Sequence, residues 1–223
     1  MYPQTNAARS VRDLSGVWDF RFNANDPWQT IAVPASYNDQ SPDPEFRRHY
    51  GMAYYRTRFT VPEGARRVLR FDAVTHNAAV RLNGEEIATH RGGFLPFEAD
   101  ITALAQPGET VTLEVEVDNR IGHSTLPVGN EGGTAGIPAV EAGKARQQMQ
   151  GVNLPNFDFF NYAGITRPVH LYTTPAAYIA DIALAPAMDG TLDYKINTIG
   201  DGLASIEILN DEGKVVADGK GEN

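Results

Sequence analysis

Cysteine is absent from the sequence, and so is any long run of apolar residues. Without cysteine there is neither a disulfide framework nor a thiolate metal site. No apolar run approaches the length that spans a bilayer, and the opening stretch MYPQTNAARSVRDLSG lacks the hydrophobic core of a secretory signal. These absences predict a protein without membrane partners and a cytoplasmic location.

Basic residues are outnumbered, because 19 Lys and Arg stand against 28 Asp and Glu, for a net charge of -9. Binding to a phosphate backbone needs clustered Lys and Arg, so this balance argues against nucleic acid as a partner. The histidines share no spacing that is typical of metal ligands, and the motif H-E-x-x-H is missing. We therefore predict no metal site and no cofactor.

A helical repeat of apolar residues is missing as well, since no long window places them three or four positions apart. Alternation at every second position is frequent instead. In TVTLEVEVD, residues 110–118, Val111, Leu113, Val115 and Val117 alternate with polar residues, which is the pattern of a half-buried strand. The same pattern recurs in YYRTRFTV.

Short strands separated by glycine and proline account for most of the remaining sequence. Asn83-Gly84 lies between two alternating runs and is the strongest short hairpin signal. Further strand candidates are GVWDFRF, TIAV, RVLRFDAV, FEADIT and RPVHLYT. About eight or nine short strands of this kind predict an all-β protein whose first domain is a jelly-roll β-sandwich.

Two regions depart from this regularity. Residues 119–157 form a long connection with little pattern, and connections beyond roughly 15 residues are usually functional or disordered. From Tyr178 the sequence predicts three or four more strands joined by Asp-Gly turns, about half of a sandwich domain. We therefore expect a jelly-roll domain over residues 1–177 and a truncated second β-sandwich over residues 178–223.

Catalytic motifs are scarce. The stretch GHSTL resembles a nucleophile elbow only until Leu126 takes the place of the second glycine, so Ser124 is not supported as a nucleophile. The carboxylate pairs Glu85-Glu86 and Asp211-Glu212 fall in predicted hairpin turns, where solvated surface charge is the expected state. Adjacent residues of a strand also point to opposite faces, a poor arrangement for an acid and its partner. We predict no catalytic residue in this chain.

Two residues remain candidates for ligand contact. Trp28, which follows NDP, is expected to be exposed, where its ring could stack on a sugar, whereas Trp18 is expected in the core. Asp158 lies among aromatic residues in NFDFFNYAGITRPVHLYTTP, and burying a lone carboxylate there would cost several kcal/mol. Either Asp158 caps backbone amides of the turn at residues 161–164, as Asp commonly does, or it is aimed at a ligand.

Four stretches together resemble the N-terminal region of the β-glucuronidases of glycoside hydrolase family 2. They are AVPASYNDQ (32–40), LRFDAVTHNAAVRLNG (69–84), HRGGFLPFEADIT (90–102) and FDFFNYAGITRPVHLYTTP (157–175). Their order and spacing fit, and the resemblance extends from about Leu14 to the end of the sequence. The second and fourth stretches are specific at the level of β-glucuronidase.

The resemblance implies an enzyme of three parts: a jelly roll, an immunoglobulin-like sandwich and a (β/α)₈ barrel with two catalytic glutamates. Such an enzyme hydrolyses β-D-glucuronides with retention, for which two carboxyls about 5 to 5.5 Å apart are needed. The sequence supplies the jelly roll and about half of the second sandwich, whereas the barrel is absent. In the family the aspartate of DFFNYAG hydrogen-bonds sugar hydroxyls, so the resemblance implies substrate binding by Asp158.

The leading hypothesis is therefore a non-catalytic N-terminal part of a β-glucuronidase, with the barrel and a glucuronide as partners and a homo-oligomer as a further expectation. One alternative is a free-standing carbohydrate-binding module, which the unfinished second sandwich argues against. Another is a purely structural domain that supports the barrel.

Overall fold

The computed structural model describes residues 3–128, 151–155 and 159–221. The chain divides into two compact units, one made of Met1–Glu63 with Arg67–Thr173 and the other of Gly64–Arg66 with Thr174–Asn223. The division at Thr173 falls near the boundary expected at residue 177, and the assignment of domains on either side stays a prediction.

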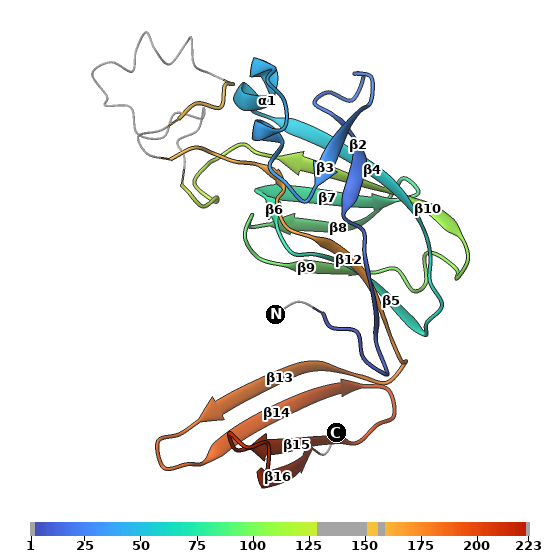
Figure 1. Ribbon diagram of the computed structural model, residues 1–223, viewed down its shortest axis with the longest axis vertical. Helices are drawn as coiled ribbons and strands as arrows, with labels where there is room; N and C mark the ends of the chain where they lie inside the picture. The colour runs from blue at the N-terminus through green and yellow to red at the C-terminus, as the bar shows by residue number, and fades with distance from the viewer. Residues whose placement is uncertain (1–2, 129–150, 156–158, 222–223) are drawn as a thin grey trace. The chain divides into compact units, whose positions relative to one another are not determined.

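The first unit is a sandwich of two antiparallel sheets (Figure 1). One sheet has four strands in the order β1 (Ser10–Asp13), β12 (Val169–Thr174), β5 (Arg66–Phe71) and β9 (Phe97–Asp100). The other has six, in the order β3 (Gln29–Val33), β2 (Gly16–Arg21), β4 (Met52–Thr60), β10 (Thr110–Asp118), β7 (Asn77–Leu82) and β8 (Glu85–Arg91). The all-β prediction is confirmed.

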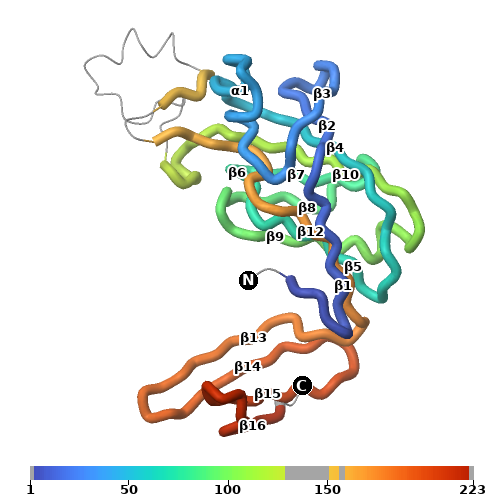
Figure 2. The backbone as a smooth tube through the Cα atoms, in the orientation of Figure 1, coloured from blue at the N-terminus to red at the C-terminus, as the bar shows by residue number. Residues whose placement is uncertain are grey.

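Small elements complete the first unit. β6 (Val74–Thr75) pairs with β11 (Gly164–Ile165), and two short helices, η1 (Tyr37–Asp39) and α1 (Pro44–Arg48), lie between β3 and β4 in the chain. The backbone trace shows β1, near the N-terminus, beside β12, late in this unit (Figure 2). Neither β1 nor α1 was expected from the sequence, because SVRD has no apolar alternation and PEFRR is too short to show a helical repeat.

The apolar side chains at the alternating positions fill the space between the two sheets. Val111, Leu113, Val115 and Val117 of β10 are all fully buried, and the residues between them are partly exposed. Trp18 is 2% exposed and belongs to the core, as expected, with its indole nitrogen donating to the carbonyl of Leu14 at 2.9 Å. Burial of this apolar surface is the main favourable term in the stability of the sandwich.

The hairpin predicted at Asn83-Gly84 is confirmed. The two residues join β7 to β8 and have φ angles of 51° and 87°. Two consecutive positive φ angles match a type I′ turn, whose twist suits a two-residue hairpin and favours Asn followed by Gly.

The second unit consists of two hairpins. β13 (Tyr178–Pro186) pairs with β14 (Leu192–Ile199), and β15 (Ala204–Leu209) pairs with β16 (Val215–Gly221). The turns contain Gly190 and Gly213 at φ angles of 87° and 78°. These four strands are those expected from the Asp-Gly spacing. Their large apolar side chains are mostly exposed, including Ile182, Leu184, Ile208 and Val215.

Among the residues that the structure describes, no helix is long and apolar enough to cross a membrane.

Candidate functional site

Asp158, the residue predicted to contact substrate, lies outside the described residues, as do residues 129–150 of the long connection. The chain is described on both sides of Asp158, in residues 151–155 and again from Phe159 onward. We call these two segments the leading stem (151–155) and the trailing stem (159–165). Their contacts show how the chain is held on either side of Asp158.

Asn161 anchors the trailing stem in the interior. Its side chain is 3% exposed, and its amide nitrogen donates to the carbonyl of Asn119 at 2.8 Å. The amide oxygen lies 2.6 Å from Nε2 of His76. Because that oxygen can only accept, the proton of the neutral His76 ring resides on Nε2. Asn161 thus links the stem to the chain after β10 and to the chain before β7.

The leading stem is tied to the trailing stem directly. The Asn153 side chain, which is buried, donates to the carbonyl of Asn161 at 2.9 Å, and its backbone amide donates to the carbonyl of Arg48 at 2.8 Å. Asn119 in turn accepts from the amide of Gly51 at 2.7 Å and donates to the carbonyl of His49 at 2.8 Å. Both stems therefore meet at the end of α1.

Asn38 fixes Ala163, two residues further along the trailing stem. Its amide oxygen accepts from the backbone amide of Ala163 at 2.9 Å, and its amide nitrogen donates to the carbonyl of Phe46 at 2.8 Å. The carbonyl of Ala163 accepts from the amide of Tyr37 at 3.1 Å. Since buried amides are costly unless they are hydrogen-bonded, this arrangement strongly favours one conformation of the stem.

The electrostatics of this interior favour neutral groups. Burial lowers the pKa of His76 below its usual value, and burial likewise lowers the pKa of His49, whose ring stacks on Phe22 with centroids 4.1 Å apart. Burial raises the pKa of the Tyr55 phenol. The asparagine and histidine side chains of this network include no carboxylate. The network therefore holds the two stems together and offers no pair of an acid and a base.

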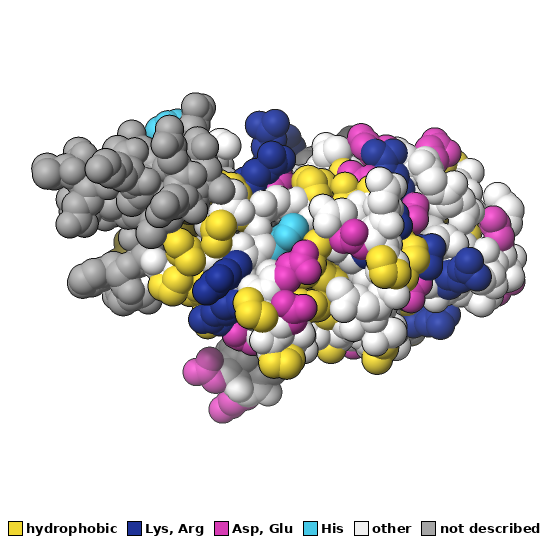
Figure 3. All heavy atoms as spheres, turned by 90° about the horizontal axis from the view of Figure 1, so that it is seen from above, with side chains coloured by type: hydrophobic (Ala, Val, Ile, Leu, Met, Phe, Trp, Pro, Cys, Tyr) yellow, Lys and Arg dark blue, Asp and Glu magenta, His cyan; other side chains and the backbone are white. Residues whose placement is uncertain are grey.

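An exposed cluster covers the outer side of the trailing stem. The guanidinium of Arg47 lies 3.8 Å from the ring centroid of Phe160 and 5.3 Å from that of Tyr162. It also donates to the Tyr162 hydroxyl at 3.5 Å and forms an ion pair with Asp39. Figure 3 looks onto the end of the first unit that carries α1 and shows hydrophobic and basic side chains next to one another.

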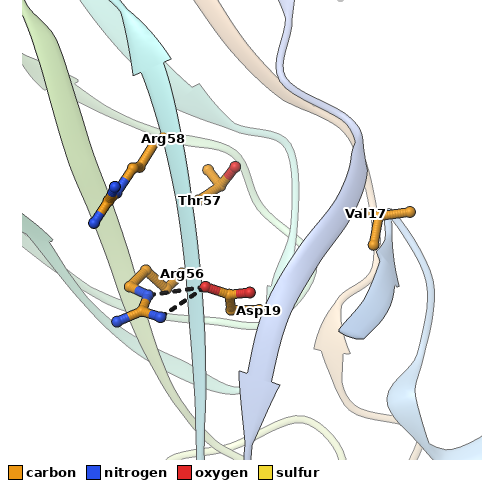
Figure 4. A pocket seen from close by; sticks show the side chains of 5 residues that line it. All are labelled: Val17, Asp19, Arg56, Thr57 and Arg58. Atoms are coloured by element: carbon orange, nitrogen blue, oxygen red, sulfur yellow. Dashed lines mark hydrogen bonds and ion pairs between the residues drawn. The ribbon is translucent and has the colours of Figure 1, made fainter. Parts of the chain in front are cut away.

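The outer face of the six-stranded sheet has a shallow hollow of about 370 Å³, lined by Val17, Asp19, Arg56, Thr57 and Arg58 (Figure 4). Arg56 is already bound, because its Nε and a terminal nitrogen lie 3.0 and 2.8 Å from one oxygen of Asp19. The hollow therefore contains the ion pair of Arg56 with Asp19 and the exposed guanidinium of Arg58. Its lining residues include no pair of carboxylates and no histidine that could act as acid or base.

Trp28 lies close to this hollow. The expectation that it is exposed is wrong, because the residue is partly buried and the guanidinium groups of Arg21 and Arg56 lie 4.1 and 4.2 Å from its ring. The sequence could not reveal the contact with Arg56, since Arg56 belongs to β4 and Trp28 to the connection between β2 and β3.

The other candidates from the sequence are surface residues. Ser124, Glu85, Glu86, Asp211 and Glu212 are all exposed, and Glu86 pairs with Arg81 at 3.2 Å. In the described part of the chain, no group of three or more His, Cys, Asp or Glu side chains could hold a metal ion.

Several residues that shape the site carry no recognisable signal in the sequence. Asn38, Asn119 and Asn153 look like ordinary turn residues, and Arg47 like ordinary surface charge. Asn161 and Asn38 stood inside stretches that carry the family resemblance, DFFNYAG and AVPASYNDQ, but nothing in either stretch indicates a buried network.

Comparison with known proteins places this architecture among relatives. The family model "Glycosyl hydrolases family 2, sugar binding domain" matches residues 11–175. A β-glucuronidase of Paenibacillus borealis is 34% identical over 245 aligned residues that cover all of this chain and 40% of the relative. The human β-glucuronidase is 33% identical over 99% of this chain and 38% of the relative. The chain thus spans about 40% of the length of these curated relatives.

The similar solved structures are β-glucuronidases as well. The β-glucuronidase of Faecalibacterium prausnitzii is 50% identical, with a TM-score of 0.83, and the match covers 99% of this chain and 40% of that one. The β-glucuronidase of Bifidobacterium dentium, solved with coumarin-3-O-glucuronide, is 44% identical with a TM-score of 0.83, over 98% of this chain and 41% of that one.

Proposed function

The chain belongs to glycosyl hydrolases family 2 through its sugar-binding domain, and from this we propose that it is the non-catalytic N-terminal part of a retaining β-glucuronidase. The curated relatives and solved structures named above are β-glucuronidases, and each extends well beyond the part that this chain covers. In this proposal the remainder of the protein supplies the barrel, both catalytic glutamates and the reaction itself. The cytoplasmic location stays a prediction.

The chain contributes one carboxylate, Asp158, to the mouth of the active site, where it accepts hydrogen bonds from sugar hydroxyls. The observation that carries this role is the buried network that joins the two stems on either side of Asp158, through Asn153, Asn161, Asn119 and His76. A ligand-binding group needs support of this kind, because its position must hold within a fraction of an ångström. A turn that served only to connect strands would not require it.

Replacement of Asp158 by alanine in the full-length protein tests this role. Loss of charge-assisted hydrogen bonds of about 1.5–3 kcal/mol should cut kcat/KM for a chromogenic glucuronide by roughly tenfold to a few hundredfold. The melting temperature should be nearly unchanged. Asp211→Ala, in an exposed turn of the second unit, is the matched control and should keep wild-type kinetics. Unchanged kinetics with a clearly lower melting temperature would show that Asp158 is only a turn residue.

The isolated chain of 223 residues should have no glycosidase activity. Assayed with the same glucuronide, it should match the buffer blank, and turnover that follows the chain through repeated purification would contradict the assignment of catalysis to the missing barrel. Titration of the isolated chain with glucuronic acid addresses the alternative of a free-standing carbohydrate-binding module, which requires saturable binding without the barrel.

A further inference from the structure

The outer face of β2 and β4 is basic. Arg56 and Arg58 are two positions apart on β4, so both side chains point to the same face of the sheet. Arg56 lies opposite Asp19 of β2, and Arg21 follows Asp19 by two positions on that strand. Three guanidinium groups therefore share this half of the face with a single carboxylate.

Two of these arginines have no carboxylate partner among the described residues. Arg56 is paired with Asp19, since its Nε and one terminal nitrogen both donate to the same carboxylate oxygen. Arg21 stacks on the ring of Trp28 at 4.1 Å and donates to a backbone carbonyl at 3.5 Å. Arg58 is exposed, and within the described part of the chain it makes no hydrogen bond and no ion pair (Figure 4).

The other half of the same face has the opposite balance of charge. Arg81 of β7 pairs with Glu86 at 3.2 Å and with Glu116 at 3.3 Å. Glu114 of β10 lies between Arg81 and Arg56 in the register of the sheet. Positive and negative side chains are thus segregated along this face, and the excess of positive charge lies on β2 and β4.

The basic half is also hollowed. Arg56 and Arg58 line the hollow of about 370 Å³ together with Val17, whose side chain is 72% exposed (Figure 4). Val17 lines a second hollow of about 330 Å³ as well, where the lining includes Gln29 and Thr30 of the edge strand β3. One hollow therefore offers guanidinium groups and the next offers a hydroxyl and an amide, with an apolar side chain between them.

We propose that this face of β3, β2 and β4 binds an acidic polysaccharide. Carboxylates of the chain would pair with Arg58 and with the remaining terminal nitrogen of Arg56, because a guanidinium presents its donors in a planar fork that fits a carboxylate. Hydroxyls of neighbouring sugars would meet Thr30 and Gln29. The inference goes beyond the proposed function and rests on it only in the choice of a sugar acid as the repeating unit.

A sparsely charged chain suits this surface better than a densely charged one. Asp19 and Glu114 stand beside the arginines, and the whole chain has a net charge of -9. Both repel a nucleic acid, whose binding depends on many clustered basic contacts. A polyuronate carries one carboxylate per sugar. Because each contact is weak and exposed, several linked sugars are needed for measurable affinity, and a single sugar acid is not enough.

Affinity electrophoresis of the full-length protein in gels that contain polygalacturonic acid tests the proposal. Mobility, measured against the same protein in a polymer-free gel, should fall to a plateau as the polymer concentration rises. Arg58→Gln should weaken the apparent affinity about fivefold, since one exposed ionic contact per chain is lost. Arg58→Glu, which places a carboxylate in the hollow, should abolish the retardation.

Two controls accompany these variants. Arg91→Gln and Arg91→Glu make the same charge changes at an exposed position of β8, at the other edge of the sheet, and should bind like the wild type. The fully methyl-esterified polymer has the same backbone without its charge and should cause no retardation. Retardation that Arg58→Glu leaves unchanged, equal losses in the Arg91 variants, or equal binding of the esterified polymer would overturn the proposal.

Hydrolysis of a chromogenic glucuronide by the same wild-type preparation separates this inference from the proposed function. Hydrolysis without any retardation by polygalacturonic acid overturns the polysaccharide site and leaves the proposed function standing. Retardation that depends on Arg58, in a full-length protein without hydrolysis, supports the polysaccharide site and contradicts the proposed function.

Discussion

Single asparagine side chains join segments of this protein that no strand pairing connects. Asn38, Asn119 and Asn161 are 2%, 0% and 3% exposed, and their amide groups bond mainly to backbone atoms of loops. An asparagine amide carries both donors and an acceptor, so one side chain can satisfy two buried backbone groups at once. His76 is the fourth member of this network, because its Nε2–H donates to the amide oxygen of Asn161. Since the His76 ring can take up a second proton, the network is sensitive to pH.

Acid should weaken folding through His76. Burial lowers the pKa of His76 in the folded state below the value near 6.5 of an unfolded chain. Above pH 6.5 both states are neutral and the residue contributes no pH dependence. Below pH 6.5 the unfolded chain binds a proton that the folded chain does not, so the free energy of unfolding falls by up to about 1.4 kcal/mol per pH unit.

Urea unfolding at pH 7.5 and pH 5.5 measures this effect. His76→Gln keeps a donor toward Asn161 without a titratable ring, and it should reduce the difference between the two pH values. His123→Gln makes the same change at an exposed position and should leave the difference as it is in the wild type. An equal pH dependence in all three proteins would refute the assignment to His76.

Among the strands, charge pairing governs which residues lie on the sheet surface, whereas available space governs which residues fit in the interior. On the outer face of the six-stranded sheet, five charged residues of alternating sign occupy consecutive strands, each directly opposite the next: Asp19, Arg56, Glu114, Arg81 and Glu86. Opposite charges in cross-strand positions stabilise a sheet and set its register. In the interior, by contrast, space is the constraint, and the two-residue strand β11 shows this most clearly.

Gly164 of β11 is expected to tolerate no side chain. Its φ angle is 120°, and a Cβ atom there would lie 2.5 Å from the hydroxyl oxygen of Tyr55, which is itself buried. Gly164→Ala should therefore lower the free energy of unfolding by about 2 to 4 kcal/mol. Gly122→Ala is the control, because nothing lies within 4 Å of its Cβ position. Chemical denaturation of both variants compares them, and equal stabilities would contradict the steric argument.

At the scale of the whole molecule, the two units differ in how well they bury their apolar residues. The first unit encloses a continuous core, whereas Ile182 and Leu184 on one face of β13 are 50% and 56% exposed. They pair with Ile196 and Tyr194 of β14, so the four side chains lie on one face of the hairpin. Apolar faces of this kind are covered in stable proteins, and unpaired strand edges invite association.

The isolated chain should therefore self-associate at high concentration or exchange its amide hydrogens fastest in residues 174–221. Sedimentation and hydrogen exchange measure the two outcomes. Leu184→Lys should weaken association, and Ala185→Lys, on the opposite face of the same strand, should weaken it less. A monomer whose residues 174–221 are as protected as the first unit would contradict both expectations.

Much of the fold follows from local sequence. The strands β4 and β10, the Asn83-Gly84 turn and the burial of Trp18 were predicted because side-chain alternation and turn preference depend on residues a few positions apart. The elements without a signal in the sequence are all short: β1 and α1 have four and five residues, η1 has three and β11 has two. Too few residues carry the pattern in such elements, and their existence depends on the surfaces they pack against.

Local sequence patterns thus establish the all-β class, the positions of most strands along the chain and the family resemblance to which DFFNYAG contributes. The contacts that hold Asn161 and Ala163 of that motif become visible in the folded protein alone. Asn161 meets Asn119 and His76 across 42 and 85 residues of sequence, and Asn38 meets Ala163 across 125. No local pattern encodes such contacts, because an asparagine in a turn and an asparagine in a buried network look identical until folding brings the distant backbone groups to it.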